Sequence, residues 1–218
     1  MHCDGPRKLP PVTTGRFAPS PTSDLHLGNL RTAVLAWLLA RDDAGAFLLR
    51  IEDLDQQRVA AAPQVAQRQL TDLAALGIDW DGEVVRQSQR LDLYRDAAAG
   101  LETYECYCTR REIAEASQAP HGSYRPYPGT CAHLTRSERA ARRAVRPAAI
   151  RVRAHGAAMT VHDLHAGEVS GEVDDFVLFR ADSTPAYNLA VVVDDGLQGV
   201  TQRSEEHTSE LQSRFGSS

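Results

Sequence analysis

The stretch Gly15–Asn29, GRFAPSPTSDLHLGN, decides the fold, because a strand ends and a helix begins within it. An apolar, β-prone segment leads into a turn rich in Pro and Ser, and after His26 apolar residues recur at helical spacing. Asp24 is a candidate N-cap, and Gly28 allows another group to approach the first helical turn. Unpaired backbone N–H groups and the positive end of the helix dipole would face the turn, with His26 as a further donor. The pattern predicts a polyphosphate site; the alternative is a strand–loop–helix with an incidental histidine.

Length and composition indicate a globular protein. The chain has 218 residues, of which 42% are hydrophobic, so it can bury a core as one domain with an insertion or as two small domains. Its net charge of -5 argues against a generally basic nucleic-acid coat, although a local basic patch is compatible with it. No apolar run approaches about eighteen residues and no secretory signal is recognisable. We therefore expect a cytoplasmic protein with no membrane partner.

A second strand is expected over Ala46–Ile51, an apolar run broken only by Arg50. Carboxylates cluster at its C-terminal end, where ligands bind in open α/β sheets. For Asp53 and Asp55 a solvated acidic turn is an equally good interpretation, so we favour function for Glu52 alone. Helices are then expected over residues 59–76, ending at a glycine, and over 88–101. This β–α–β–α order predicts a doubly wound sheet.

Three cysteines, Cys106, Cys108 and Cys131, fall within one stretch, and such grouping in a reduced compartment favours metal over disulfide. Three thiolates suit tetrahedral zinc, and by spacing alone a histidine is the default fourth ligand. The candidates for this position are His121, His133, Tyr124 and Tyr127. The alternative is three free, partly buried thiols.

Seven arginines lie between Arg136 and Arg153. A helix over residues 137–145 would spread the first of them over an exposed face, and the usual interpretation is solvation. A phosphate-binding stripe for RNA is the alternative, weakened by the lack of interleaved aromatic residues. Strands are then expected at AIRVR, TVHDLH and DDFVLFR, and the glycines of GEVSGEV suggest turns. Further on, Tyr187 begins an apolar stretch that ends in two aspartates.

These motifs, taken in order, resemble the class I glutamyl-type aminoacyl-tRNA synthetases. The matching segments are GRFAPSPT, the HLGN of residues 26–29, LLRIEDLD, Gln87-Ser88 with Arg90, and PAYNLAVVVDD. Within this superfamily, the C-x-C…Y-x3-C insertion and the compact spacing resemble the glutamyl-Q tRNA(Asp) synthetases. The resemblance implies a Rossmann-like α/β catalytic domain with a small zinc-binding insertion. It also implies tRNA-independent activation of glutamate by ATP, and transfer of the glutamate to queuosine in the anticodon of tRNA(Asp).

The resemblance further implies a role for each matching residue. Arg16 would fork onto a glutamate carboxylate, Glu52 would take the ammonium, and Tyr187 would add a hydroxyl contact. The rest of the glutamate site would be Phe17, Ala18, Pro19 and Ser20. His26, Gly28 and Asn29 would hold ATP and stabilise charge during catalysis. One Zn2+ would bind Cys106, Cys108, Tyr127 and Cys131, and Mg2+ would accompany ATP. The partners implied are ATP, L-glutamate and queuosine-containing tRNA(Asp), and we expect a monomer.

On this basis residues 12–104 and 147–202 are expected to form the two halves of the catalytic region, with the zinc-binding insertion at 105–146. The sequence also departs from the family pattern. Ser23 replaces a glycine, Glu205 falls where a glutamate-binding arginine is expected, and no KMSKS-type lysine follows.

The segment RSEEHTSELQS reads like a translated sequencing adapter. We hypothesise that the chain is C-terminally truncated and that residues 203–218 are a disordered tail or an artefact of the gene record. An uninterrupted source gene encoding this tail in frame would refute that hypothesis. We expect weak or no activity from the chain as it stands. The alternatives are a catalytic fragment of a glutamyl-tRNA synthetase, or an inactive zinc- and nucleotide-binding fragment.

Overall fold

The computed structural model describes residues 13–42, 44–116, 127–163 and 166–203. The chain forms two compact units, the first comprising residues 1–90 and 194–218 and the second residues 91–193. The division expected from the sequence, at residues 105 and 147, remains a prediction. Within the described ranges, no helix has the length and apolar character needed to cross a bilayer.

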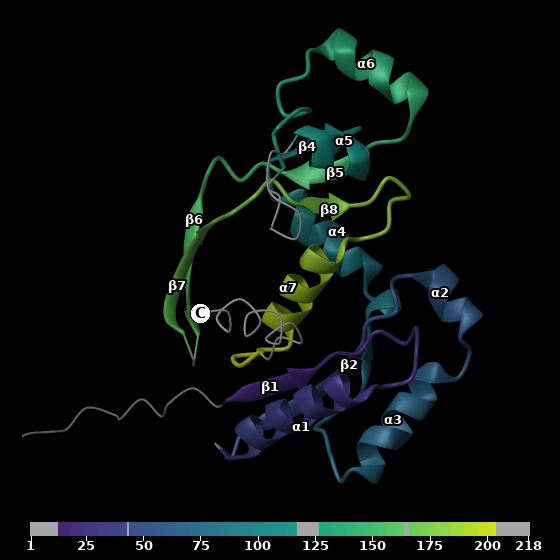
Figure 1. Ribbon diagram of the computed structural model, residues 1–218, viewed down its shortest axis with the longest axis vertical. Coiled ribbons are helices and arrows are strands. Elements are labelled where there is room, and N and C mark those ends of the chain that lie inside the picture. Colours follow the sequence, from purple (N-terminus) through teal and green to yellow (C-terminus); the bar gives the residue numbers. More distant parts are fainter. Residues whose placement is uncertain (1–12, 43, 117–126, 164–165, 204–218) are drawn as a thin grey trace, which may run out of the picture. The chain divides into compact units, whose positions relative to one another are not determined.

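The first unit is built on a parallel sheet of three strands in the order β1–β2–β3, of which β1 and β2 are labelled in Figure 1. The strands are β1 (Thr14–Phe17), β2 (Ala46–Ile51) and β3 (Val85–Arg86). Helix α1 (Leu27–Asp42) connects β1 to β2, as expected of the helix after His26. This parallel β–α–β arrangement confirms the Rossmann-like α/β class.

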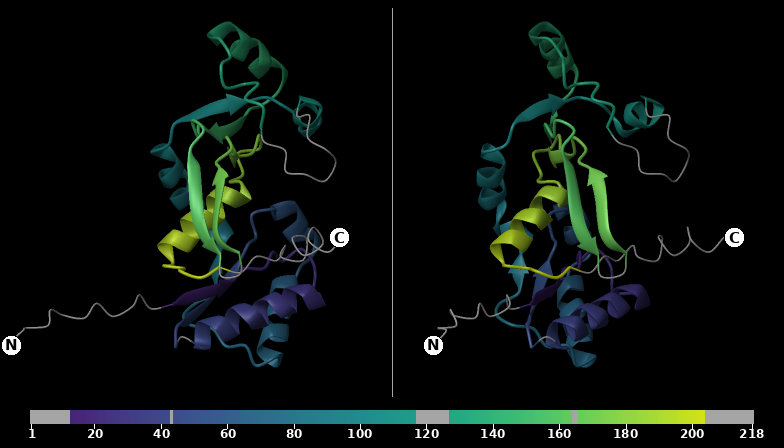
Figure 2. Two further views of the ribbon diagram at one scale, coloured as in Figure 1. Left: turned by 60° about the vertical axis from the view of Figure 1, so that its left-hand side comes forward. Right: turned by 90° about the vertical axis from the view of Figure 1, so that its left-hand side faces the viewer.

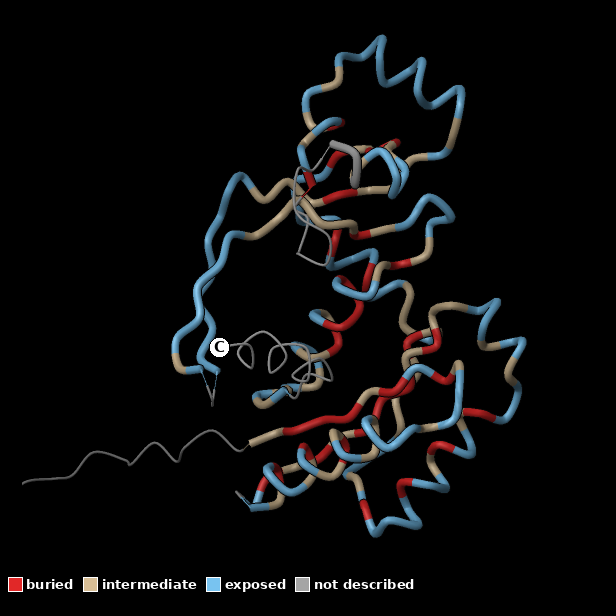
Figure 3. Tube along the Cα trace, in the orientation of Figure 1, coloured by how far each residue is buried: buried red, intermediate tan, exposed pale blue. Residues whose placement is uncertain are grey.

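The core of this unit lies between the sheet and its helices, visible as the buried segments of Figure 3. Small residues on α1 allow the helix to approach β1 closely. A Cβ on Gly15 would lie only 2.9 Å from the Cβ of Ala40, so this strand position requires glycine. The buried core residues are Phe17, Ala33, Ala36, Ala40, Phe47, Leu49, Leu73 and Ile78.

The single helix expected over residues 59–76 is instead two helices, α2 (Gln56–Ala61) and α3 (Val65–Ala75). Pro63 disfavours helix in the residue before it and has no N–H to donate, and Gln64 takes the left-handed conformation with φ 69°. The helical spacing of apolar residues continues across Pro63, so the sequence pattern did not reveal the break between the two helices. Gly77, with φ 80°, follows the end of α3 as expected.

The second unit contains an antiparallel sheet in the order β4–β5–β8 and a separate β6–β7 hairpin. Its strands are β4 (Thr103–Cys106), β5 (Ala149–Val152), β6 (Ala158–Asp163), β7 (Gly167–Glu172) and β8 (Val177–Phe179). Its helices are α4 (Leu91–Ala99), α5 (Arg110–Ala116) and α6 (Arg136–Val145). The β6–β7 hairpin extends away from the three-stranded sheet (Figure 2).

Two expectations for the middle of the chain are corrected. The helix expected over residues 88–101 begins at Leu91, after the 3₁₀ turn η1 (Gln87–Gln89). The glycines of GEVSGEV lie in strand β7 rather than in turns, and only Gly167, with φ 75°, has a turn-like conformation. Glycine is tolerated here because β7 is almost wholly exposed and has little side-chain packing to lose. The apolar stretch from Tyr187 forms helix α7 (Tyr187–Leu197), whose residues from Asp194 onward belong to the first unit.

Candidate active site and metal centre

His26 caps the N-terminus of α1. Its ring Nδ1 accepts hydrogen bonds from the backbone N–H groups of Gly28 at 3.0 Å and Asn29 at 3.4 Å. The Asn29 side chain in turn accepts from the His26 backbone N–H at 3.2 Å, which reproduces the reciprocal pattern of a capping box. Asp24 is therefore not the N-cap; its carboxylate accepts a hydrogen bond from Arg68 instead. Because Nδ1 accepts, the neutral ring carries its proton on Nε2, which is a donor suited to a phosphate oxygen.

This cap changes how the helix N-terminus can receive an anion. The sequence suggested unpaired N–H groups facing the turn, but His26 already satisfies those of Gly28 and Asn29. A Cβ on Gly28 would lie 2.9 Å from Cε1 of the His26 ring, so only glycine lets the ring fold over the helix end. The predicted residues His26, Gly28 and Asn29 thus form one local structure.

The Pro-rich loop between β1 and α1 is held by two neighbouring segments. Gln69 of α3, a buried residue, donates from Nε2 to the backbone carbonyls of Ser20 at 3.1 Å and Ser23 at 2.8 Å. The backbone N–H of Glu52 donates to the carbonyl of Pro19 at 3.0 Å. These bonds fix the loop relative to the C-terminal end of β2. Nothing in the sequence distinguished Gln69 from the surface residues of its helix.

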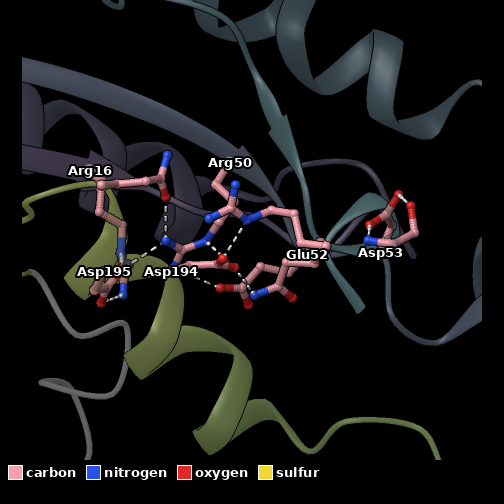
Figure 4. A network of polar contacts seen from close by, with 10 residues as sticks. Arg16, Arg50, Glu52, Asp53, Asp194 and Asp195 are labelled. Carbon is pink, nitrogen blue, oxygen red and sulfur yellow. Dashed lines mark hydrogen bonds and ion pairs between the residues drawn. The ribbon is translucent and has the colours of Figure 1, made fainter. Parts of the chain in front are cut away.

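Arg16 and Arg50 converge on one carboxylate of α7 (Figure 4). The Arg16 guanidinium donates from Nε and an Nη to the two oxygens of Asp195, at 3.2 and 3.3 Å. Arg50 donates from one Nη to Asp195 and to Gln198, both at 2.8 Å. Asp195 therefore forms ion pairs with an arginine of β1 and an arginine of β2.

Arg50 has no exposed surface, and it is the central cation of the site. Its other contacts are with Glu52 at 3.4 Å and with Asp194, whose oxygen lies 3.8 Å from Nε. Burial lowers the pKa of Arg50, but the ion pairs, with Asp195 foremost, outweigh burial and raise it. Burial likewise acts to raise the pKa of Asp195, and the two guanidinium groups hold it below its usual value. Arg50 remains charged, because the surrounding carboxylates compensate for the cost of burying its cation.

Glu52 lies on the edge of this network with its side chain 7% exposed. Burial raises the pKa of Glu52, and the nearby Arg50 and Arg16 only partly oppose this effect. The adjacent Asp53 turns away from Arg50 and accepts hydrogen bonds from the Ser88 backbone N–H and hydroxyl, both at 2.8 Å. Asp53 is thus a structural link to η1, and of these two neighbouring carboxylates only Glu52 contacts Arg50.

Of the residues predicted to bind glutamate, the structure brings Arg16 of β1 close to Glu52, which follows β2. Pro19, in the loop after β1, is hydrogen-bonded to the backbone of Glu52. Phe17 is a core residue, Ala18 is half-buried and Ser20 is exposed. Tyr187, 55% exposed, begins α7 in the second unit, and its contact with glutamate remains a prediction. The predicted set omitted Arg50, Asp194 and Asp195.

Asp194 is the most enclosed carboxylate of the site. It accepts from Arg90 at 2.7 Å and from the Gln87 side chain at 3.0 Å, and it is fully buried. The sequence carried a signal for it, because an aspartate pair ending an apolar segment is costly to bury without cations. The lone Arg50 within an apolar strand was the matching signal.

The three predicted cysteines meet in the second unit. The sulfur atoms of Cys106, Cys108 and Cys131 all lie within 4.8 Å of one another, and those of Cys108 and Cys131 are 3.6 Å apart. Tetrahedral zinc with bonds of about 2.3 Å separates its sulfur ligands by about 3.8 Å, so the cluster fits a metal ion of this size. Burial raises the pKa of Cys108 to about 11. A bound cation would have the opposite effect, because it stabilises the thiolate.

Tyr127 completes this cluster. Its hydroxyl lies 3.4 Å from the sulfur of Cys106 and 3.6 Å from that of Cys108, and it accepts a hydrogen bond from the Cys131 backbone N–H at 2.8 Å. The Arg151 guanidinium lies 3.7 Å from the centre of the Tyr127 ring. Of the other candidates, His133 is exposed, and His121 and Tyr124 lie outside the described residues.

The parallel β1–α1–β2 unit with its His26-capped helix and buried arginines agrees with the comparison to known families. Residues 11–215 match tRNA synthetases class I (E and Q), catalytic domain, and the chain belongs to this family.

Among curated relatives, the chain is similar to proteins named glutamyl-Q tRNA(Asp) synthetase. It is 63% identical over 189 residues to that of Cutibacterium acnes, covering 86% of this chain and 54% of the relative. It is 58% identical over 193 residues to that of Nocardia farcinica, covering 86% and 61%. The chain thus spans between half and two thirds of these relatives.

Solved structures show the same fold. A glutamate tRNA ligase from Elizabethkingia meningosepticum, solved in complex with its amino acid, aligns with a TM-score of 0.70 at 27% identity. The alignment covers 91% of this chain and 45% of that one. The glutamate-tRNA synthetase of Elizabethkingia anophelis gives a TM-score of 0.72 at 26% identity.

Proposed function

We propose that this chain carries the glutamate- and ATP-binding part of a glutamyl-Q tRNA(Asp) synthetase, which activates glutamate without tRNA and transfers it to queuosine in tRNA(Asp). The observation that carries this proposal is the pairing of Arg16 with a carboxylate beside the buried Glu52. A site with a guanidinium that binds a carboxylate bidentately and a buried carboxylate nearby suits an amino acid, which carries both a carboxylate and an ammonium.

In this proposal Asp195 occupies the Arg16 fork until the substrate arrives. A glutamate carboxylate presents two oxygens in the same geometry as Asp195, so it would compete for the Arg16 donors, while Arg50 retains Asp195. Glu52 would accept the substrate ammonium. Its burial makes that contact stronger than the same contact in water.

ATP would lie at the start of α1, with the Nε2–H of His26 donating to a phosphate oxygen. Gly28 and Asn29 would contribute by holding the imidazole in place. The reaction needs positioning and charge stabilisation while the glutamate carboxylate attacks the α-phosphorus and pyrophosphate leaves. Mg2+ would accompany the nucleotide and supply positive charge to its phosphates.

The second unit would hold one Zn2+ on Cys106, Cys108, Cys131 and Tyr127. Three thiolates suit zinc, and the phenol oxygen of Tyr127, which already accepts a backbone N–H, would be the fourth ligand. The metal would link the segment that carries Cys106 and Cys108 to the segment of residues 127–131. It has no proposed role in the chemical step.

A glutamyl-tRNA synthetase fragment is the second candidate. Relatives named glutamate–tRNA ligase are also similar, for example at 41% identity over 208 residues in Thermoanaerobacter pseudethanolicus. The two candidates differ in whether activation needs tRNA. Glutamate-dependent ATP–pyrophosphate exchange, measured with and without tRNA on the full-length gene product, separates them, and glutamylated tRNA(Asp) with and without queuosine then identifies the acceptor.

A further inference from the structure

None of the residues of helix α6 is buried. It is held to the rest of the unit through ion pairs of Arg143 with Glu105 at 2.7 Å and of Arg146 with Glu112 at 3.4 Å. A capping box between Thr135 and Glu138 fixes its N-terminus. A helix without a buried face contributes little to a hydrophobic core, so polar contacts stabilise its position.

The arginines of this helix lie on one side. At 100° per residue, the four arginines of α6 and its C-cap residue Arg146 fall within an arc of about 120°, and we call these five residues the arginine arc. The arginine arc consists of Arg136, Arg139, Arg142, Arg143 and Arg146. Glu138, the one acidic residue of α6, is engaged in the capping box. The arc is therefore a strongly positive surface on a chain of net charge -5.

Only part of the arginine arc is committed to structure. Arg143 and Arg146 make the two ion pairs that hold the helix. Arg139 donates to the exposed carbonyl of Leu134, and within the described ranges Arg136 and Arg142 make no ion pair. Three guanidinium groups thus remain available to an anionic partner.

A cleft of about 260 Å3 adjoins the arc between α5 and α6. Its walls are mostly apolar, and the residues lining it are Tyr107, Glu112, Ala141, Arg142, Val145 and Arg146. Val145 is 76% exposed, so most of its aliphatic surface is open to a ligand. Arg142 belongs both to the arc and to the cleft wall. Phosphate-binding donors and an apolar slot are thus adjacent.

We propose that the arginine arc and this cleft bind single-stranded RNA, with backbone phosphates on Arg136, Arg139 and Arg142 and one unstacked base in the cleft. Bases of a duplex are stacked and cannot enter a slot, whereas those of a loop can be splayed out. The choice of RNA over an acidic protein rests on the proposed function. Apolar contact with a base and guanidinium contact with phosphates together supply affinity without sequence recognition.

The test compares binding of a fluorescently labelled RNA stem–loop, a blunt RNA duplex and poly-glutamate to the 218-residue chain over a range of salt concentrations. The variant R136Q/R139Q/R142Q leaves both ion pairs of α6 in place. The matched control R58Q/R95Q/R180Q removes three exposed arginines from other helices and loops. A second variant, Ala141→Leu, fills the cleft without changing charge.

We expect the arc variant to bind the stem–loop more weakly, with the slope of log K against log salt reduced by about 2 to 3, while the control keeps its slope. Ala141→Leu should lower the preference for stem–loop over duplex and leave the slope unchanged. Equal binding by wild type and arc variant, or poly-glutamate binding tighter than RNA, would overturn the proposal. Binding is read without catalysis, so a failure of glutamate activation leaves this result interpretable.

Discussion

The guanidinium of Arg16 donates to both carboxylate oxygens of Asp195, at 3.2 and 3.3 Å, across 179 residues of sequence. This contact ties the first strand of the sheet to the last helix of the described chain. It also places a carboxylate of the protein where the proposed substrate carboxylate would bind. The stability and the binding properties of the site therefore depend on the same few charges.

Substitution of Arg50 by alanine should cost about 3–5 kcal/mol of unfolding free energy, because it leaves buried carboxylates without their central cation. Urea denaturation followed by circular dichroism measures the loss. Arg58→Ala, which breaks the exposed pair with Asp55, is the control and should cost about 1 kcal/mol or less. Similar losses for the two variants would show that Arg50 is not the organising charge.

Glu52→Gln should be more stable than wild type at neutral pH and similar to it near pH 4. Burial raises the pKa of Glu52 above its usual 4.5, so the folded protein holds this proton more tightly than the unfolded chain. Wild type therefore loses stability as pH rises from the unfolded pKa through the folded one, and the variant does not. Thermal unfolding at a series of pH values tests this; parallel curves for both proteins would contradict it. Glutamate affinity should fall in the same variant.

Gly28→Ala should weaken ATP binding with little change in stability. The added Cβ would lie 2.9 Å from the His26 ring and displace it, losing a cap worth about 0.5–2 kcal/mol, while alanine gains about 1 kcal/mol in helix propensity. Calorimetric titration with ATP and a thermal melt give the two quantities. Gly196→Ala, at an open position in α7, is the control and should keep ATP affinity. Unchanged ATP affinity in Gly28→Ala would separate the cap from the nucleotide site.

The purified protein should contain one zinc ion per chain, and chelation should lower its melting temperature. Cys131→Ser should abolish zinc binding, and Tyr127→Phe should weaken it while retaining the three thiolates. Metal content by atomic emission gives the stoichiometry. Cys3→Ser, at the remaining cysteine, is the control. Full zinc affinity in Tyr127→Phe would exclude the phenol as a ligand.

Local sequence patterns predicted the elements of the first unit well. The turn at residues 19–26 separates β1 from α1, where the apolar spacing changes from that of a strand to that of a helix. The apolar run Ala46–Ile51 is β2. The break at Pro63 was missed because apolar residues on both sides keep the same spacing. Sequence periodicity does not report a left-handed residue such as Gln64.

The site was predicted only in part, for a physical reason. Arg16, Glu52 and the cysteines are local features that motifs can reveal. Apart from Glu52, the partners of Arg50 are Asp194 and Asp195 of α7 and Gln198 just after it, more than a hundred residues later, and no local pattern pairs them. The role of Asp194 and Asp195 depends on the arginines that surround them, and the fold is needed to show which arginines these are.

The most direct test of the proposed function is glutamate-dependent ATP–pyrophosphate exchange without tRNA, measured on the 218-residue chain and on the full-length product of its gene. We expect exchange in the full-length protein without tRNA, with weak or no exchange in the 218-residue chain. Exchange that appears only after tRNA is added would contradict the proposed tRNA-independent activation and favour a glutamyl-tRNA synthetase.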